Sequence, residues 1–226
     1  SGWENVKELH YFANRKLLCL LNTKYLIAEK EIKAFNLKLI FDDGNVKIYE
    51  DQYALPRAFI VPVAKVIKDK DKISKELLSE DFDPRKTVIL EEEYKGQRIK
   101  IQNQKSKIQN LSNSQFAIRN SQSKILDYQP EKVTIKTTLN KSGFLVLSDT
   151  YYPGWQVFVD GKREKLYCAD YILRAVELGA GEHLVEFRYS PLSFKIGSSI
   201  SIATLIILML VLFLRWIKRE VKVEVK

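Results

Sequence analysis

The run IGSSISIATLIILMLVLFL, residues 196–214, has no charged side chain and is followed at once by the basic tail RWIKREVKVEVK, residues 215–226. Its 19 residues would reach roughly 29 Å as an α-helix, close to the roughly 30 Å of bilayer hydrocarbon. We therefore predict a transmembrane helix over residues 193–215. Because Lys and Arg beside a span resist translocation, we expect the tail, residues 216–226, in the cytoplasm and the main body outside the bacterial cell membrane.

The charge distribution bears on nucleic-acid binding. The formal net charge is +9, but residues 95–125 contribute +7 and residues 215–226 contribute +3, which leaves −1 for all the others. The basic character therefore belongs to one linker and one membrane anchor, and the globular parts are nearly neutral. We expect no nucleic-acid partner.

Cysteine and histidine are scarce. Cys19 and Cys168 lie far apart and lack metal-ligand spacing, so isolated thiols are favoured, although a disulfide outside the cytoplasm stays open. With His10 and His183 as the two histidines, we expect no metal site and no cofactor. The first residues lack the apolar core of a signal peptide. Since the body must still cross the membrane, we expect this sequence to begin inside a longer protein.

Residues 1–94 indicate a mixed α/β unit, which we place outside the cytoplasm. A helix is expected before a short strand at Tyr25–Ala28. The turn residues Asp-Asp-Gly-Asn at 42–45 separate two strand candidates and so predict a hairpin. The remaining candidates are a strand at 57–61, a short helix at 71–78 and a strand at 87–90.

Residues 95–125 differ in composition from their surroundings. They are rich in Gln, Asn, Ser and Lys and contain near-copies of one unit, beginning at Ile101, Ile108 and Ile118. Such a segment cannot bury enough apolar surface to offset the entropy of ordering the chain. We therefore interpret it as a low-complexity basic linker or insertion; the alternative is a basic tether for anionic lipid or cell-wall polymer.

Residues 126–192 carry a dense pattern of short strands. The turn signals Pro153-Gly154, Asp160-Gly161 and Gly179-Ala180-Gly181 separate most of the candidates. Regularly spaced short strands predict a compact β-sandwich. The strand candidates are 132–139, 144–147, 155–159, 164–168, 172–176 and 183–189. The expected fold is thus a mixed α/β N-terminal unit plus an antiparallel β-sandwich, followed by one C-terminal transmembrane α-helix.

Aromatic residues near one turn of the sandwich form a candidate glycan site: Tyr151, Tyr152 and Trp155, with Asp149 close by. Aromatic faces stack on sugar rings, and a carboxylate accepts hydrogen bonds from sugar hydroxyls. The alternative, which the residues alone favour, is that Trp155 belongs to the core with the alternating valines after it and that the tyrosines frame a turn. No set of catalytic residues is recognised.

Charged residues of the predicted sandwich and small residues of the predicted span form two further groups. The charges at 170, 174, 186 and 188 could form a polar patch, and pairs of opposite charges on an exposed sheet face explain them equally well. In the outer half of the predicted span, Gly197, Ser201 and Thr204 are small enough to let helices approach closely in lipid. They predict contact with other transmembrane helices of a larger protein.

Six short motifs occur in a fixed order: LLNTKYLI (20–27), LPRAF (55–59), DPRKT (83–87), LSDTYYPGW (147–155), VDGK (159–162) and FRYSPL (187–192). In this order they resemble the C-terminal region of the YfhO-like family of bacterial polytopic membrane proteins. The resemblance covers nearly the whole chain except the segment 95–125. A Tyr-Pro-Gly-Trp turn and an Asp-Gly-Lys turn in one β-unit before a membrane helix are its most specific part.

The resemblance implies a protein whose N-terminal spans are similar to those of polyprenyl-phosphate-sugar-dependent glycosyltransferases. In such proteins the catalytic acid lies in an early outer loop, so no catalytic residue carries over to this chain. The expected role is an extracytoplasmic accessory domain and last span in lipid-linked sugar transfer to envelope polymers. The expected partners are the lipid bilayer, envelope glycan or a polyprenyl-linked sugar. The alternative is a non-catalytic envelope glycan-binding or assembly protein of the membrane.

Overall fold

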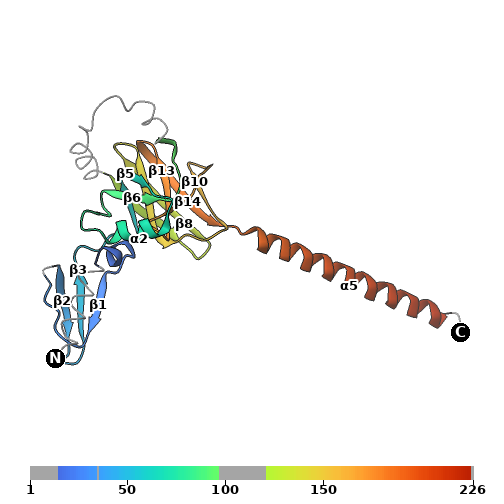
Figure 1. The fold of residues 1–226 in the computed structure, drawn as a ribbon. Helices are drawn as coiled ribbons and strands as arrows, with labels where there is room; N and C mark the ends of the chain where they lie inside the picture. The colour runs from blue at the N-terminus through green and yellow to red at the C-terminus, as the bar shows by residue number, and fades with distance from the viewer. Residues whose placement is uncertain (1–14, 35, 97–120, 225–226) are drawn as a thin grey trace.

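The computed structural model describes residues 15–34, 36–96 and 121–224. Figure 1 shows a small N-terminal sheet, a β-sandwich with helices on one side, and a long C-terminal helix that extends away from the sandwich. The expected fold class, a mixed α/β N-terminal region with a β-sandwich and one C-terminal helix, is therefore confirmed, although the strands are grouped differently from the expected bounds. The start of the first expected helix, before residue 15, and most of the expected linker, residues 97–120, lie outside the described residues.

The N-terminal sheet is antiparallel with the order β1-β3-β2. Its strands are β1 (Tyr25–Ala28), β2 (Leu37–Asp42) and β3 (Lys47–Asp51). The predicted hairpin joins β2 to β3, and its aspartates accept local backbone hydrogen bonds: Asp43 Oδ1 from the N–H of Val46 at 2.6 Å, and Asp42 Oδ1 from that of Gly44 at 2.8 Å. Gly44 has a φ of +89°, a conformation that glycine adopts without strain.

The sandwich consists of a six-stranded sheet, β4-β9-β13-β12-β6-β5, and a five-stranded sheet, β11-β10-β14-β8-β7. Neighbouring strands are antiparallel except β5 and β6, which are parallel and connected through α2 (Lys70–Leu78). The strands are β4 (Ala58–Val61), β5 (Val63–Val66), β6 (Thr87–Leu90), β7 (Gln122–Tyr128), β8 (Lys132–Leu139), β9 (Gly143–Thr150), β10 (Trp155–Val159), β11 (Lys162–Glu164), β12 (Tyr167–Ala169), β13 (Leu173–Leu178) and β14 (Gly181–Tyr189).

The six-stranded sheet is buried on both faces, which explains the continuous apolar run of β9. Leu145 and Leu147 face the other sheet and pack in a core with Val185 and Phe187. The alternate residues of β9, including Phe144, contribute to a second core beneath α2 and the helical residues 15–20. A strand covered on both faces has no need for polar alternation. The sandwich and the helices that cover it therefore form three layers: sheet, sheet and helices.

Strand membership differs from the expected ranges. The strands β4, β5 and β6, which fall within residues 1–94, pair into the sandwich, and residues 122–125 of the expected linker lie in β7. The single strand expected at 164–168 is divided into β11 and β12, which belong to different sheets. The first of these differences has a physical reason. The apolar strands β4 and β6 bury their side chains by joining the sandwich, where β4 pairs with β9 and β6 with β12.

The C-terminal helix, α5 (Leu192–Glu224), begins directly after the last strand. Residues 192–216 are long and apolar enough to cross a bilayer, and none of their most apolar stretch is buried within the described chain. The connection is tight, because the Ser190 N–H donates to the Gly154 carbonyl at 2.8 Å. A Cβ at Gly154 would lie 3.0 Å from both Tyr189 and Pro191. The β9–β10 loop therefore packs against the point where α5 leaves the sandwich.

Candidate functional site

A hollow of about 340 Å³ opens at the end of the sandwich that carries α5. Its position follows from the backbone, since Trp155 is paired with Tyr189, two residues before Pro191. The Tyr189 N–H also donates to the carbonyl of Glu131, in the β7–β8 turn, at 2.7 Å. The hollow is lined by Arg57, Tyr128, Gln129, Pro130, Val133, Ser148, Asp149, Thr150, Trp155 and Arg174.

A buried ion pair forms the floor of this hollow. The Arg174 Nη2 lies 3.1 Å from Asp149 Oδ2, and the two side chains are only 5% and 12% exposed. Burial lowers the pKa of Arg174, while the charges of Asp149 and Tyr128 act in the opposite direction. Because a buried charge without a partner is costly, Asp149 is required to hold Arg174 in this position.

Arg57 and Tyr128 extend the ion pair toward solvent. The Tyr128 hydroxyl donates to Asp149 Oδ1 at 3.1 Å, and Arg57 in turn donates to the Tyr128 hydroxyl. Arg57 Nη1 also lies 3.7 Å from Asp149 Oδ1. Burial raises the pKa of Tyr128, and the Asp149 charge adds to that effect. The hollow therefore has two guanidinium groups for one carboxylate, a net charge of +1.

Trp155 forms an aromatic wall of the hollow. The guanidinium carbon of Arg174 lies 3.8 Å from the centroid of its ring, a close cation–π contact. The Tyr189 ring lies 5.3 Å away on the neighbouring strand. The Trp155 side chain is partly buried against the inter-sheet core and still lines the hollow. Its position thus combines features of a core residue and of a binding surface.

The structure brings together two of the four predicted glycan-site residues. Asp149 and Trp155 line the hollow, whereas Tyr151 and Tyr152 do not. Burial raises the pKa of Tyr151, and Cys168 and the glutamates after β6, none of which lines the hollow, add to that effect. Tyr152 is 60% exposed on the β9–β10 loop.

The interpretation of Asp170 and Arg174 as exposed charges is wrong, since both are 4% exposed. Alternation along one strand reveals two faces, but it does not show that both faces are covered. Arg57 and Tyr128 were missed as site residues. The available signal was the position of Arg57 within the LPRAF motif, directly before an apolar strand.

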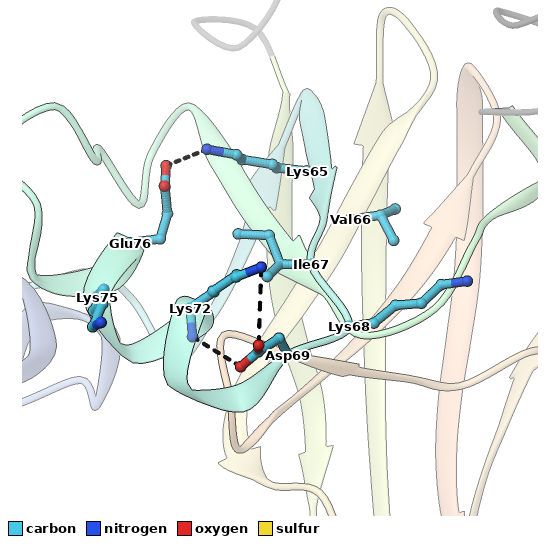
Figure 2. A pocket seen from close by; sticks show the side chains of 8 residues that line it. All are labelled: Lys65, Val66, Ile67, Lys68, Asp69, Lys72, Lys75 and Glu76. Carbon is cyan, nitrogen blue, oxygen red and sulfur yellow. Dashed lines mark hydrogen bonds and ion pairs between the residues drawn. The ribbon is translucent and has the colours of Figure 1, made fainter.

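A second hollow lies between β5 and α2 and is lined by four lysines (Figure 2). Its charges largely stabilise the helix. Asp69 caps α2 by accepting the N–H of Asp71 at 2.9 Å, and Lys65 pairs with Glu76 at 2.6 Å. Among the residues that the structure describes, no group of three His, Cys, Asp or Glu side chains gathers in a way that could hold a metal ion. Both cysteines are free thiols.

The predicted packing residues of the span lie on the exposed surface of α5. The Ser201 hydroxyl donates to the Gly197 carbonyl at 3.0 Å, and the Thr204 hydroxyl donates to the Ile200 carbonyl at 2.9 Å. Apart from its chain neighbours and the adjacent backbone of α5, no atom of the described residues lies within 4 Å of a Cβ built at Gly197. The hydroxyls of Ser201 and Thr204 are bonded to their own helix, so these two residues and Gly197 present a surface of small side chains without free donors. Its contact with other spans stays a prediction.

We expect Trp155→Ala to lower the free energy of unfolding by about 3 kcal/mol, because the ring packs against the core and against Arg174. Tyr152→Ala should change it by less than about 1 kcal/mol, since that ring is 60% exposed. Urea unfolding of the detergent-solubilised chain, followed by circular dichroism, measures both. An unchanged midpoint for Trp155→Ala together with lost binding to envelope glycan would assign the ring to sugar recognition instead of the core.

The chain is similar to known bacterial membrane proteins. The family model described as "Bacterial membrane protein YfhO" matches residues 81–201, just over half of the chain. The uncharacterized protein YfhO of Bacillus subtilis (strain 168) is 23% identical over 183 residues, which cover 81% of this chain and 19% of that protein. The chain therefore spans about a fifth of the length of this relative. No solved structure matches it.

Proposed function

Because this chain belongs to the YfhO family of bacterial membrane proteins, we propose that it forms an extracytoplasmic accessory domain and the last span of a protein that transfers lipid-linked sugars to cell-envelope polymers. The supporting observation is that the hollow around Asp149, Trp155 and Arg174 lies where the sandwich meets α5. The domain holds a sugar, or the anionic carrier of a sugar, close to the membrane surface. The transfer chemistry belongs to the remainder of the larger protein.

The chemistry of the hollow suits such a ligand. The rings of Trp155 and Tyr128 line it, each with one face covered by a guanidinium group, that of Arg174 or of Arg57, so that a sugar ring would contact the ring surface that remains. Asp149 accepts hydrogen bonds from hydroxyl groups, and the excess positive charge of Arg57 and Arg174 favours a phosphate on the carrier. Arg57 is 43% exposed and so remains accessible to a ligand.

Substitutions at the exposed side of the hollow test this function in the full-length protein. We expect Arg57→Ala and Tyr128→Phe to reduce the sugar content of the envelope polymer by about tenfold each, with an unchanged amount of protein in the membrane. Arg163→Ala, at an exposed position of β11, is the matched control and should have no effect. Full sugar content in both site variants would exclude the proposed role.

The same variants separate transfer from binding alone. If sugar transfer stays normal while the chain loses its affinity for envelope glycan, the alternative of a non-catalytic glycan-binding protein is supported.

We further propose that the sandwich lies outside the cytoplasm and the tail inside it, because cations directly follow the uncharged run 196–214 of α5. A reporter that is active only in the cytoplasm should therefore be active when fused after Lys226 and inactive when fused after Ser190. Enzyme assays on intact cells, with protein levels measured by immunoblot, provide the readout. The reverse pattern would place the sandwich in the cytoplasm and exclude the proposed function.

A further inference from the structure

An apolar groove of about 350 Å³ lies between α2, the helical residues 15–20 and the turn between β12 and β13. Leu17 and Leu20 form one wall, Leu77 and Leu78 the other, and Ile172 lies at the rim. The groove is open, since the side chains of Leu78 and Ile172 are 55% and 38% exposed. It is separate from the hollow around Asp149, because β13 directs Leu173 to this side and Arg174 to the other.

One polar side chain in the groove is incompletely paired. Asp170 is 4% exposed, and its Oδ1 accepts the Ile89 N–H at 2.8 Å. Its Oδ2 is buried and has no hydrogen-bond partner among the residues that the structure describes. Burial raises the pKa of this carboxyl to about 7. A buried acceptor without a donor is unfavourable, so a ligand that supplies the donor would gain from it.

The backbone around Asp170 is strained. Asp170 and the next residue, Tyr171, have φ values of +46° and +77° in a turn that contains no glycine. Consecutive non-glycine residues in this region are uncommon and cluster at binding sites. The turn places Asp170 among the residues that line the groove, and its backbone N–H donates to the Ile89 carbonyl at 2.8 Å.

The groove lies at the end of the sandwich next to the membrane helix. The Tyr151 N–H donates to the Ile172 carbonyl at 2.6 Å and so connects the β12–β13 turn to the β9–β10 loop. That loop reaches Gly154, which contacts Pro191 immediately before α5. The groove is thus connected through one loop to the start of α5, the helix that is long and apolar enough to cross a bilayer.

We propose that this groove binds an apolar chain that ends in a hydrogen-bond donor, with a long-chain alcohol from the membrane as the ligand class. The leucine walls bury the hydrocarbon, and the hydroxyl donates to Asp170 Oδ2. A volume of about 350 Å³ is at the small end of ligand sites, so the groove holds the terminal part of a chain. This binding site is independent of the proposed sugar function.

Photoaffinity labelling of the complete chain in phosphatidylcholine nanodiscs tests the inference. The probes are dodecanol and its methyl ether, each with a diazirine in the chain, at about pH 8.5, where Asp170 is ionised. We expect dodecanol to label residues 17–21, 74–78 or 170–173 about tenfold more strongly than the ether. Equal labelling by the two probes, labelling elsewhere, or no labelling would overturn the inference.

Three variants test whether the labelling depends on the groove and on Asp170. Leu78→Trp fills the groove from its exposed rim and should abolish labelling, whereas Leu184→Trp, at a 43% exposed position of β14, should retain it. Asp170→Asn keeps an acceptor for Ile89 and presents an amide N–H₂ to the groove, so the preference for alcohol over ether should be lost. A preference for alcohol that survives in Asp170→Asn would show that the carboxylate does not recognise the hydroxyl.

Discussion

Replacing Asp149 with alanine is expected to lower the free energy of unfolding of the sandwich by about 3–5 kcal/mol. The substitution removes the carboxylate that lies 3.1 Å from Arg174 and leaves that guanidinium, 5% exposed, without a counter-charge. It also removes the acceptor of the Tyr128 hydroxyl. Urea unfolding of the detergent-solubilised chain, followed by near-ultraviolet circular dichroism, measures the change.

An exposed ion pair provides the control for Asp149→Ala. Lys136 and Glu182 lie 3.3 Å apart with side chains 56% and 67% exposed, so Glu182→Ala should change stability by less than about 1 kcal/mol. The double variant Asp149→Ala/Arg174→Met should recover much of the lost stability, because no unpaired buried charge remains. Similar small losses for Asp149→Ala and Glu182→Ala would show that Arg174 reaches water when its partner is removed.

The local features of the fold were predictable from sequence. The Asp160-Gly161 turn joins β10 to β11 through two residues with φ values of +51° and +77°, as a two-residue hairpin requires. The alternation of β14 also identified its inward residues, since Val185 and Phe187 are fully buried. These signals act within a few residues, so they persist in a single sequence. The uncharged run before the basic tail is equally local.

Long-range pairing explains what the sequence did not reveal. Ala58 of β4 pairs with Leu147 of β9, and no pattern within either strand specifies that partner. The site depends on the same pairing, because β4 and β9 bring Arg57 beside Asp149. Two aromatic neighbours in sequence, Tyr151 and Tyr152, were predicted together with Trp155, but the β9–β10 loop directs them away from the hollow. Proximity in sequence was therefore a poor guide to proximity in the site.

The contribution of Asp170 to the stability of the chain is also expected to decrease as the pH rises from about 4 to about 7. Burial raises the pKa of this carboxyl to about 7 in the folded state, whereas an unfolded aspartate has a pKa near 3.9. Between these values the folded state retains a proton that the unfolded state has released. The contribution of Asp170 to stability is therefore fully present below about pH 4 and decreases by roughly 1.4 kcal/mol per pH unit up to about pH 7.

Asp170→Asn isolates this contribution from the other titrating groups. Asparagine keeps an oxygen for the Ile89 N–H and adopts a positive φ readily, so the variant should fold. Unfolding of both proteins in urea at several pH values between 4 and 8 gives the difference in their free energies of unfolding. Relative to the parent, the variant should become steadily more stable up to about pH 7 and then remain constant. A difference that does not change with pH would show that Asp170 has an ordinary pKa, and hence that its Oδ2 is reached by water or by a donor.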